Sequence, residues 1–158
     1  MAADALDSVD RQILEILQRE GRITNAELAS RVRISPSACL RRTRALERSG
    51  AIAGYRAVLS RRAVGLGLTV FVEVKVDRHS KELAAELERT FAEMPEIVSA
   101  HVVSGAADFL LEVVVPDLDA YQRLLLDRLL ELPHFTDVRS NFAIRTLCAE
   151  EPLPLEHL

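Results

Sequence analysis

Apolar residues recur at helical spacing through the first 50 residues and predict three helices. Asp7 is a candidate N-cap and Gly21 a candidate stop, so the first helix should span about 8–20. Thr24 and Glu27 have the spacing of a capping box, in which each side chain accepts a hydrogen bond from a backbone N–H that the helix leaves unpaired. A second, short helix should begin there.

The third predicted helix is the longest of this half. Ser35 is placed to cap it, Pro36 suits its first turn, and Gly50 suits the left-handed conformation that ends many helices. Only Arg33 and Ile34 separate it from the second helix. Two helices joined by a tight turn, the second longer and basic, are typical of a helix-turn-helix with its recognition helix.

The third helix has an apolar and a basic side. Cys39, Thr43 and Leu46 share a face that can point into a core. A run of charge on a helix is commonly just a solvated face, but this run falls on the helix that the motif assigns to DNA. Guanidinium groups bind guanine edges and phosphates, and N-terminal backbone N–H groups favour phosphate. The residues that we predict to bind double-stranded DNA are Ser35, Ser37, Arg41, Arg42, Arg44 and Arg48.

A β-prone stretch at 51–59 follows and is interpreted as the wing of a winged helix-turn-helix. The glycines and the basic pair Arg61 and Arg62 then indicate a linker at 60–67. These two arginines either contact phosphate or are solvated. We therefore expect a DNA-binding domain over residues 1–62.

The pattern beyond residue 67 alternates between strand and helix periods. Valines at every second position from Val70 to Val76 predict a strand with one buried face. Further strands are expected at 97–103, 109–115 and 138–146. One helix should follow Ser80, with a stripe of Leu83, Leu87, Phe91 and Met94, and another should follow Asp117 or Asp119, with a stripe of Leu118, Tyr121, Leu125, Leu129 and Leu132. The order βαββαβ predicts a ferredoxin-like domain at 68–149 and an α+β protein.

Both helices of such a domain cover one face of the sheet. The other face would display Phe71, Glu73, Lys75, His101 and Arg145, a mixture that suits a subunit interface better than bare solvent. Residues 150–158 have no periodicity and are either a strap across a neighbouring subunit or a loose tail.

Charge separates the two halves of the chain. Residues 1–62 contain 12 Arg and 7 Asp or Glu, giving +5, whereas the remainder of the 158 residues carries −9 within the total of −4. A basic module is attracted to polyphosphate and an acidic one is repelled by it. A charge difference of this kind between two halves of a chain also arises by chance, but here the basic half is the one that contains the predicted helix-turn-helix.

Several classes of protein are disfavoured. Cys39 and Cys148 lie far apart with no metal-binding spacing, which fits a reducing compartment without disulfide or metal, and no apolar run is long enough for a membrane span. We expect a cytoplasmic protein without a cofactor. His101, Ser104 and Asp108 occur in one hairpin, a poor basis for a catalytic triad, so no catalytic residues and no enzymatic activity are predicted.

The chain resembles the Lrp/AsnC (feast/famine) family of transcription regulators from Leu6 to about Leu147. The resemblance is carried by Leu6-Asp7-x-x-Asp10-x-x-Ile13-Leu14, Gly21-Arg22-Ile23-Thr24-Asn25-x-Glu27-Leu28, Ser35-Pro36-x-x-Cys39-Leu40-x-Arg42-x-Arg44-x-Leu46-Glu47, Val103-Ser104-Gly105-x-x-Asp108-Phe109-Leu110-Leu111 and Val115-Pro116-Asp117. It implies homodimers formed through the C-terminal sheets, often assembled into octamers, with an amino acid bound between dimers near the Gly-x-x-Asp loop. Two departures stand out: Arg33 replaces a common glycine in the turn, and Ala106-Ala107 replace acidic or aromatic residues in the loop.

The loop is a hairpin turn by spacing alone. With the resemblance it becomes a candidate effector site, because a carboxylate ligand needs backbone donors and an ammonium group needs an acidic acceptor. The predicted effector-binding residues are His101, Ser104, Gly105 and Asp108. We expect a sequence-specific regulator modulated by an amino acid. The alternatives are a nucleoid-type architectural protein without an effector and, less compatible with the basic N-terminal half, a free-standing amino-acid sensor.

Overall fold

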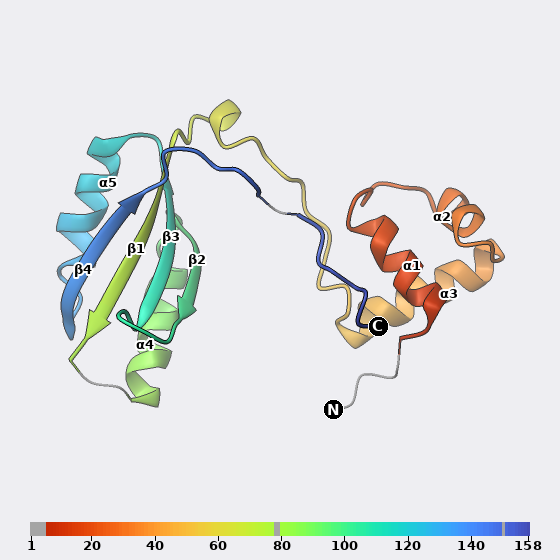
Figure 1. Ribbon diagram of the computed structural model, residues 1–158, viewed down its shortest axis with the longest axis horizontal. Helices are drawn as coiled ribbons and strands as arrows, with labels where there is room; N and C mark the ends of the chain where they lie inside the picture. The colour runs from red at the N-terminus through yellow and green to blue at the C-terminus, as the bar shows by residue number, and fades with distance from the viewer. Residues whose placement is uncertain (1–5, 78–79, 150) are drawn as a thin grey trace. The chain divides into compact units, whose positions relative to one another are not determined.

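The computed structural model describes residues 6–77, 80–149 and 151–158 and divides into two compact units (Figure 1). The described residues of 1–58 and 148–158 form one unit, here called the head, and Leu59–Leu147 form the other, the body. Each unit has its own hydrophobic core. The C-terminal segment therefore belongs to the head of its own chain.

Three helices make up the head: α1 (Ser8–Leu17), α2 (Asn25–Arg31) and α3 (Pro36–Ser49). The predicted caps are present, with Asp7, Thr24 and Ser35 each accepting backbone N–H bonds at a helix start. Helix α1 ends earlier than predicted because a tight turn, closed by Arg19 N–H to the Ile16 carbonyl, follows it.

Apolar side chains from all three helices meet in the head core. They are Ile13, Leu14, Leu28, Ala29, Val32, Cys39 and Leu46. Burial raises the pKa of the Cys39 thiol, which therefore stays neutral as a small apolar group. The C-terminal segment adds to this core through Leu155, and the Gln18 side chain both donates to and accepts from the backbone of Leu153. The C-terminal segment is thus neither a strap across a neighbouring subunit nor a loose tail, because it packs on the head of its own chain.

The predicted wing contains no strand. Residues 53–60 are extended, without helix or sheet pairing, and Tyr55, Val58 and Leu59 are exposed. The β-prone composition of this segment is therefore not accompanied by a strand in the structure. A 3₁₀ turn, η1 (Arg62–Val64), then leads into the body.

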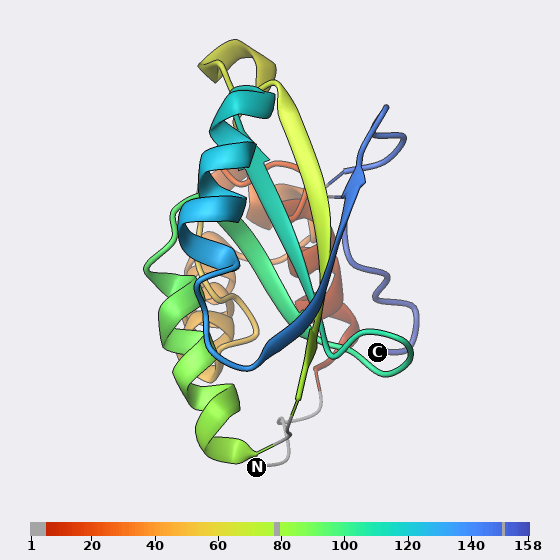
Figure 2. The ribbon, with the colours of Figure 1, turned by 90° about the vertical axis from the view of Figure 1, so that its left-hand side faces the viewer.

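The body is a four-stranded antiparallel sheet with the strand order β2-β3-β1-β4. Its strands are β1 (Leu68–Val76), β2 (Ile97–Val102), β3 (Phe109–Val115) and β4 (Phe135–Phe142). Helices α4 (Lys81–Ala92) and α5 (Leu118–Leu124) cover the same face of this sheet (Figure 2). This is the predicted ferredoxin-like arrangement.

The last third of the body differs in detail from the prediction. Helix α5 continues into a π-helical turn, η2 (Leu125–Leu129), and Leu118 is not part of the core, since it lies in the first turn with 59% of its surface exposed. Leu124, which the prediction omitted, is buried instead. Strand β4 begins three residues early because His134, at φ +73°, reverses the chain directly before it.

The second face of the sheet carries no helix. Strand register places Phe71 opposite Glu112 and Asn141, and Glu73 opposite Arg139, on this face. Phe71 remains 37% exposed. Arg145 was predicted to lie on this face, but it comes after the end of β4 at Phe142. Phe142 pairs with Val70, near the start of β1.

Candidate DNA-binding surface and ligand pocket

Helix α3 is held by its neighbours so that one side faces the core and the other is free. Cys39 and Leu46 point inward, as predicted. At the turn, the Asn25 side chain donates to the Pro36 carbonyl over 2.9 Å, which fixes the start of α3 against the start of α2. The starts of α2 and α3 are therefore held together at the end of α3 where a recognition helix would contact DNA.

Three arginines form the exposed side of α3. Arg41, Arg44 and Arg48 are exposed, and none of their side chains has a hydrogen-bond or ion-pair partner within residues 6–77, 80–149 and 151–158. Their spacing of three and four puts them on one face. Ser37 shares the N-terminal end of this face, with its Oγ 3.2 Å from the Ser35 Oγ. We call Ser37, Arg41, Arg44 and Arg48 the arginine stripe.

Ser35 and Arg42 have structural partners within the head. Ser35 caps α3 by accepting the Ala38 N–H. Arg42 Nη1 lies 2.7 Å from Asp7 Oδ2 and 2.8 Å from Asp10 Oδ1, and its side chain is only 32% exposed. Backbone N–H donation from Asp10, followed by the Arg42 side chain, lowers the pKa of Asp7. The local sequence pattern grouped Arg42 with the DNA-contacting arginines because its acidic partners lie about thirty residues away.

The turn between α2 and α3 is conformationally strained. Arg33 has φ +58°, the left-handed region that favours glycine. This is the position at which Arg33 stands in place of a glycine common in the family. The two helices nevertheless keep their relation, since Ile34 N–H still bonds to the Ala29 carbonyl.

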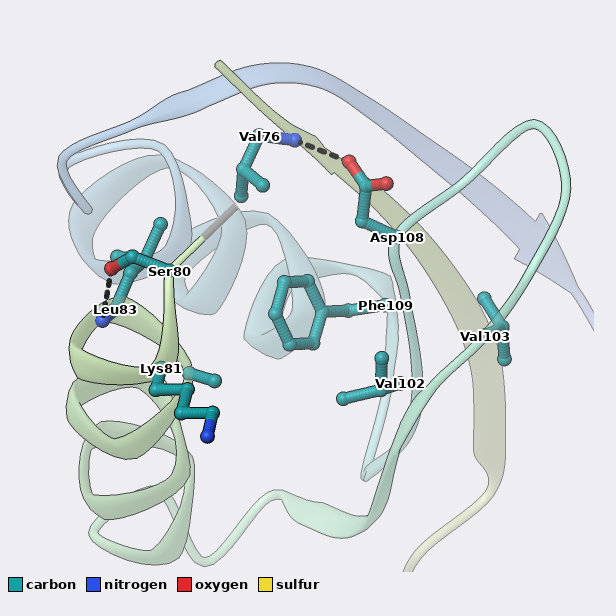
Figure 3. Close-up of a pocket in the computed structure, with 9 residues that line it drawn as sticks. Val76, Ser80, Lys81, Leu83, Val102, Val103, Asp108 and Phe109 are labelled. Carbon is teal, nitrogen blue, oxygen red and sulfur yellow. Dashed lines mark hydrogen bonds between the residues drawn. The ribbon is translucent and has the colours of Figure 1, made fainter. Parts of the chain in front are cut away.

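The body contains a pocket of about 390 Å³ between the start of α4 and the end of the sheet where β3 begins (Figure 3). Most of its wall is apolar, and two of its side chains, Lys81 and Asp108, are charged. The lining residues are Val76, Ser80, Lys81, Leu83, Ala84, Val102, Val103, Asp108 and Phe109. An apolar hollow with a few convergent polar groups has the usual character of a small-molecule site.

Asp108 organises the loop beside this pocket. Its Oδ2 accepts the Val76 N–H over 2.9 Å, as Figure 3 shows, and its backbone N–H donates to the Val74 carbonyl. Its own carbonyl accepts the Val103 N–H. Asp108 thus closes the hairpin and fastens it to β1.

The structure separates the four predicted effector residues. Asp108 lines the pocket, whereas Ser104 and Gly105 lie in the exposed loop, where Gly105 has φ +126°. His101 pairs with Leu110 and so projects to the sheet face opposite Val102. The sequence reasoning missed Lys81 and Val102, which border the pocket from α4 and β2. Lys81 directly follows the predicted cap Ser80, but no sequence signal joined that helix to the loop.

Two protein-family models match the chain. One, described as a winged helix-turn-helix DNA-binding domain, matches residues 6–53, and the other, the Lrp/AsnC ligand binding domain, matches residues 69–153. Together with the exposed basic helix and the pocket, these matches define a DNA-binding regulator with a ligand-binding body. The chain belongs to the Lrp/AsnC family of transcription regulators. No helix in the part of the chain that the structure describes is long and apolar enough to cross a membrane.

Individual relatives agree with this assignment. The leucine-responsive regulatory protein of Escherichia coli K12 is 44% identical over 135 residues, which are 85% of this chain and 82% of the relative. A transcriptional regulator of Neisseria meningitidis, solved in complex with L-Met, superposes with a TM-score of 0.91 at 37% identity, covering 97% of this chain and 99% of the other. An AsnC family regulator of Agrobacterium tumefaciens gives 0.90 at 35% identity, with coverages of 96% and 99%.

Proposed function

We propose that the chain is a homo-oligomeric regulator that binds operator DNA through its heads and a free amino acid through its bodies. Amino-acid binding changes DNA affinity or assembly. The protein acts on the nucleoid, in the bacterial cytoplasm. Two observations together carry this proposal: an exposed arginine stripe on α3, whose three guanidinium groups have no partner among the described residues, and an apolar pocket with charged groups in the other unit.

In this proposal the arginine stripe enters the major groove. Arg41, Arg44 and Arg48 bind guanine edges or phosphates, and Ser37 binds a phosphate at the helix start. Arg42 contributes by holding α3 against α1 through Asp7 and Asp10. Paired heads of a dimer then read a pseudo-palindrome whose half-sites are about one helical turn, or a multiple of it, apart.

The pocket beside α4 is the effector site of this proposal. Lys81 and the positive end of the α4 helix dipole attract the ligand carboxylate, and Asp108 supplies a carboxylate for its ammonium group. The side chain of the ligand packs on Leu83, Val102 and Phe109, which favours an apolar amino acid. The L-Met complex of the Neisseria relative supports this ligand class. The exposed loop with Ser104 and Gly105 is then available to a neighbouring dimer.

Calorimetry against the twenty amino acids tests the site. We expect heat of binding from an apolar amino acid with the wild type, and its loss in Val102→Asp, which places a charge in the apolar wall. Val98→Asp is the matched control, because Val98 is exposed on the same strand but does not line the pocket. Equal affinity in both variants would move the effector site elsewhere, and no heat with any amino acid would refute amino-acid sensing.

The uncovered sheet face is the proposed dimer contact, and octamers form from these dimers. Phe71 stands at its centre, flanked by Glu112 and Asn141. Burying an aromatic side chain in a two-fold contact favours association, whereas a carboxylate there opposes it. Phe71→Asp should therefore sediment as a monomer at micromolar concentration. A persistent dimer would exclude this face.

A further inference from the structure

A second hollow, of about 230 Å³, lies at the other end of β3 from the effector pocket. Strand β3 begins at Phe109, beside the effector pocket, and ends at Val115, beside this hollow. Among the residues that the structure describes, none borders both pockets. We call it the linker pocket, and its lining residues are Glu96, Val115, Pro116, Ala120, Arg123, Leu124, Asp127 and Arg128.

Charged residues of both signs and apolar residues together line the linker pocket. Arg128 Nη1 lies 3.1 Å from Glu96 Oε2. Arg123 and Asp127 have neither a hydrogen bond nor an ion pair with any residue that the structure describes. The pocket thus offers one cation and one anion that are not already neutralised by each other, next to the side chains of Ala120 and Leu124.

The helix changes to a π-helical turn between these two charges. Arg123 and Asp127 are four residues apart, the spacing at which an α-helix brings opposite charges together. Between them the helix widens into η2, closed by Leu130 N–H to the Leu125 carbonyl, five residues back. The wider turn changes the angle between successive side chains. Such single π turns inside helices occur frequently at functional sites.

We infer that the linker pocket is a second ligand site and that it takes a free amino acid in its zwitterionic form. Arg123 binds the carboxylate and Asp127 the ammonium group, both as charge-assisted hydrogen bonds. The ligand side chain packs on Ala120 and Leu124. This site is independent of the proposed effector pocket, since it uses other residues at the other end of the sheet.

The position of the linker pocket gives such a ligand a route to the DNA-binding unit. Pro116, which lines the pocket, also lies close to the linker, since a side chain at position 67 in place of glycine would have its Cβ only 3.2 Å from the Pro116 carbonyl oxygen. The η1 turn of the linker and the start of α5 lie at the same end of the sheet (Figures 1 and 2). Arg61 of the linker is fixed to the sheet by Glu112 at 2.7 Å. A ligand on Pro116 therefore adjoins the segment that leads to the head.

Methyl NMR of the full-length protein, labelled at Ala, Leu and Val, tests the inference. Each of the twenty L-amino acids is titrated to about 10 mM, enough to detect a millimolar Kd. We expect at least one to shift the Ala120 and Leu124 methyl resonances. The corresponding amine and the corresponding carboxylic acid, each lacking one charge, should fail to do so. The Val102 and Val103 methyl groups report the effector pocket in the same spectra.

Arg123→Ala should weaken binding at the linker pocket about tenfold or more, as expected for loss of a charge-assisted hydrogen bond. Arg89→Ala, an exposed arginine on α4 outside both pockets, is the matched control and should leave it unchanged. Absence of any Ala120 or Leu124 shift would overturn the inference, as would equal shifts from the amine or the carboxylic acid, or equal affinity in Arg123→Ala. Shifts confined to Val102 and Val103 would reject the linker pocket and leave the proposed effector pocket intact.

Discussion

Arg42 of helix α3 is paired with Asp7, the N-cap residue of helix α1, with 2.7 Å between Nη1 and Oδ2. The same nitrogen lies 2.8 Å from Oδ1 of Asp10, which completes the capping box of α1. One guanidinium therefore ties the recognition helix to the cap of the first helix. Arg41, on the same helix, has no side-chain partner among the described residues, so alanine variants of Arg42 and Arg41 have opposite expectations for stability.

Arg42→Ala should destabilise the head, whereas Arg41→Ala should not. The first leaves two carboxylates without their cation, and the second removes an exposed side chain with no partner among the described residues. Urea unfolding should show a midpoint lower by roughly 0.2–0.5 M for Arg42→Ala and unchanged within about 0.1 M for Arg41→Ala. Equal midpoints for the two variants would show that the pair does not hold the helices together.

The stability of the head should fall in acid. Asp7 has a pKa lowered from its ordinary value of 3.8, so its contribution is present above that value and is lost as pH falls through the lowered pKa of the folded state. The Ile13 methyl resonance, in the head core, reports this transition during unfolding at each pH. Asp7→Asn should remove this part of the acid dependence. Asp119→Asn, an exposed carboxylate of the body, should retain it, and the same loss in both variants would refute the assignment.

Replacing Arg33 by glycine should stabilise the head. A left-handed backbone costs an L residue about 1–2 kcal/mol, and glycine avoids this cost. Part of the resulting gain in stability is offset because glycine makes the unfolded chain more flexible. The expected net gain in the free energy of unfolding is about 0.5–1 kcal/mol. Arg33→Ala keeps the Cβ and should give no gain, which separates relief of strain from loss of charge. A less stable Arg33→Gly would contradict the strained turn.

Arg41, Arg44 and Arg48 should control DNA affinity without controlling stability. Each lost base contact costs about 1–3 kcal/mol of binding, and each lost phosphate contact lowers the slope of log affinity against log salt by about one unit. Fluorescence anisotropy of the triple alanine variant, read at several salt concentrations, measures both. Arg19→Ala, exposed in the head but outside α3, is the control. Unchanged affinity in the folded triple variant would remove α3 from the interface.

Features encoded by neighbouring residues were predicted well from the sequence. The caps at Asp7, Thr24 and Ser35 and the buried valines of β1 follow from local hydrogen bonding and from periodicity. The start of β4 was missed because it depends on the left-handed backbone of a single residue, His134.

Relations between distant segments were the harder part. Arg42 of α3 pairs with carboxylates at the start of α1. The wall of the effector pocket likewise combines Lys81 of α4 with Val102 of β2. His101 was grouped with Asp108 by proximity in sequence, but strand alternation sends its side chain to the opposite face. Sequence spacing does not encode which elements become neighbours, so the site could be located only to a loop.

Coupling between the body and the head is the central claim for this protein, and DNA affinity measured with and without a bound amino acid tests it directly. The DNA is a fragment that the protein selects from random sequence, and the salt concentration is held fixed. An amino acid that calorimetry shows to bind should change the Kd for DNA, or the assembly state on it, by about 5–150-fold in the wild type and in Val98→Asp, but not in Val102→Asp. If an amino acid saturates the wild-type body but changes neither the Kd for DNA nor the assembly state, the proposed coupling is contradicted and an architectural protein is favoured.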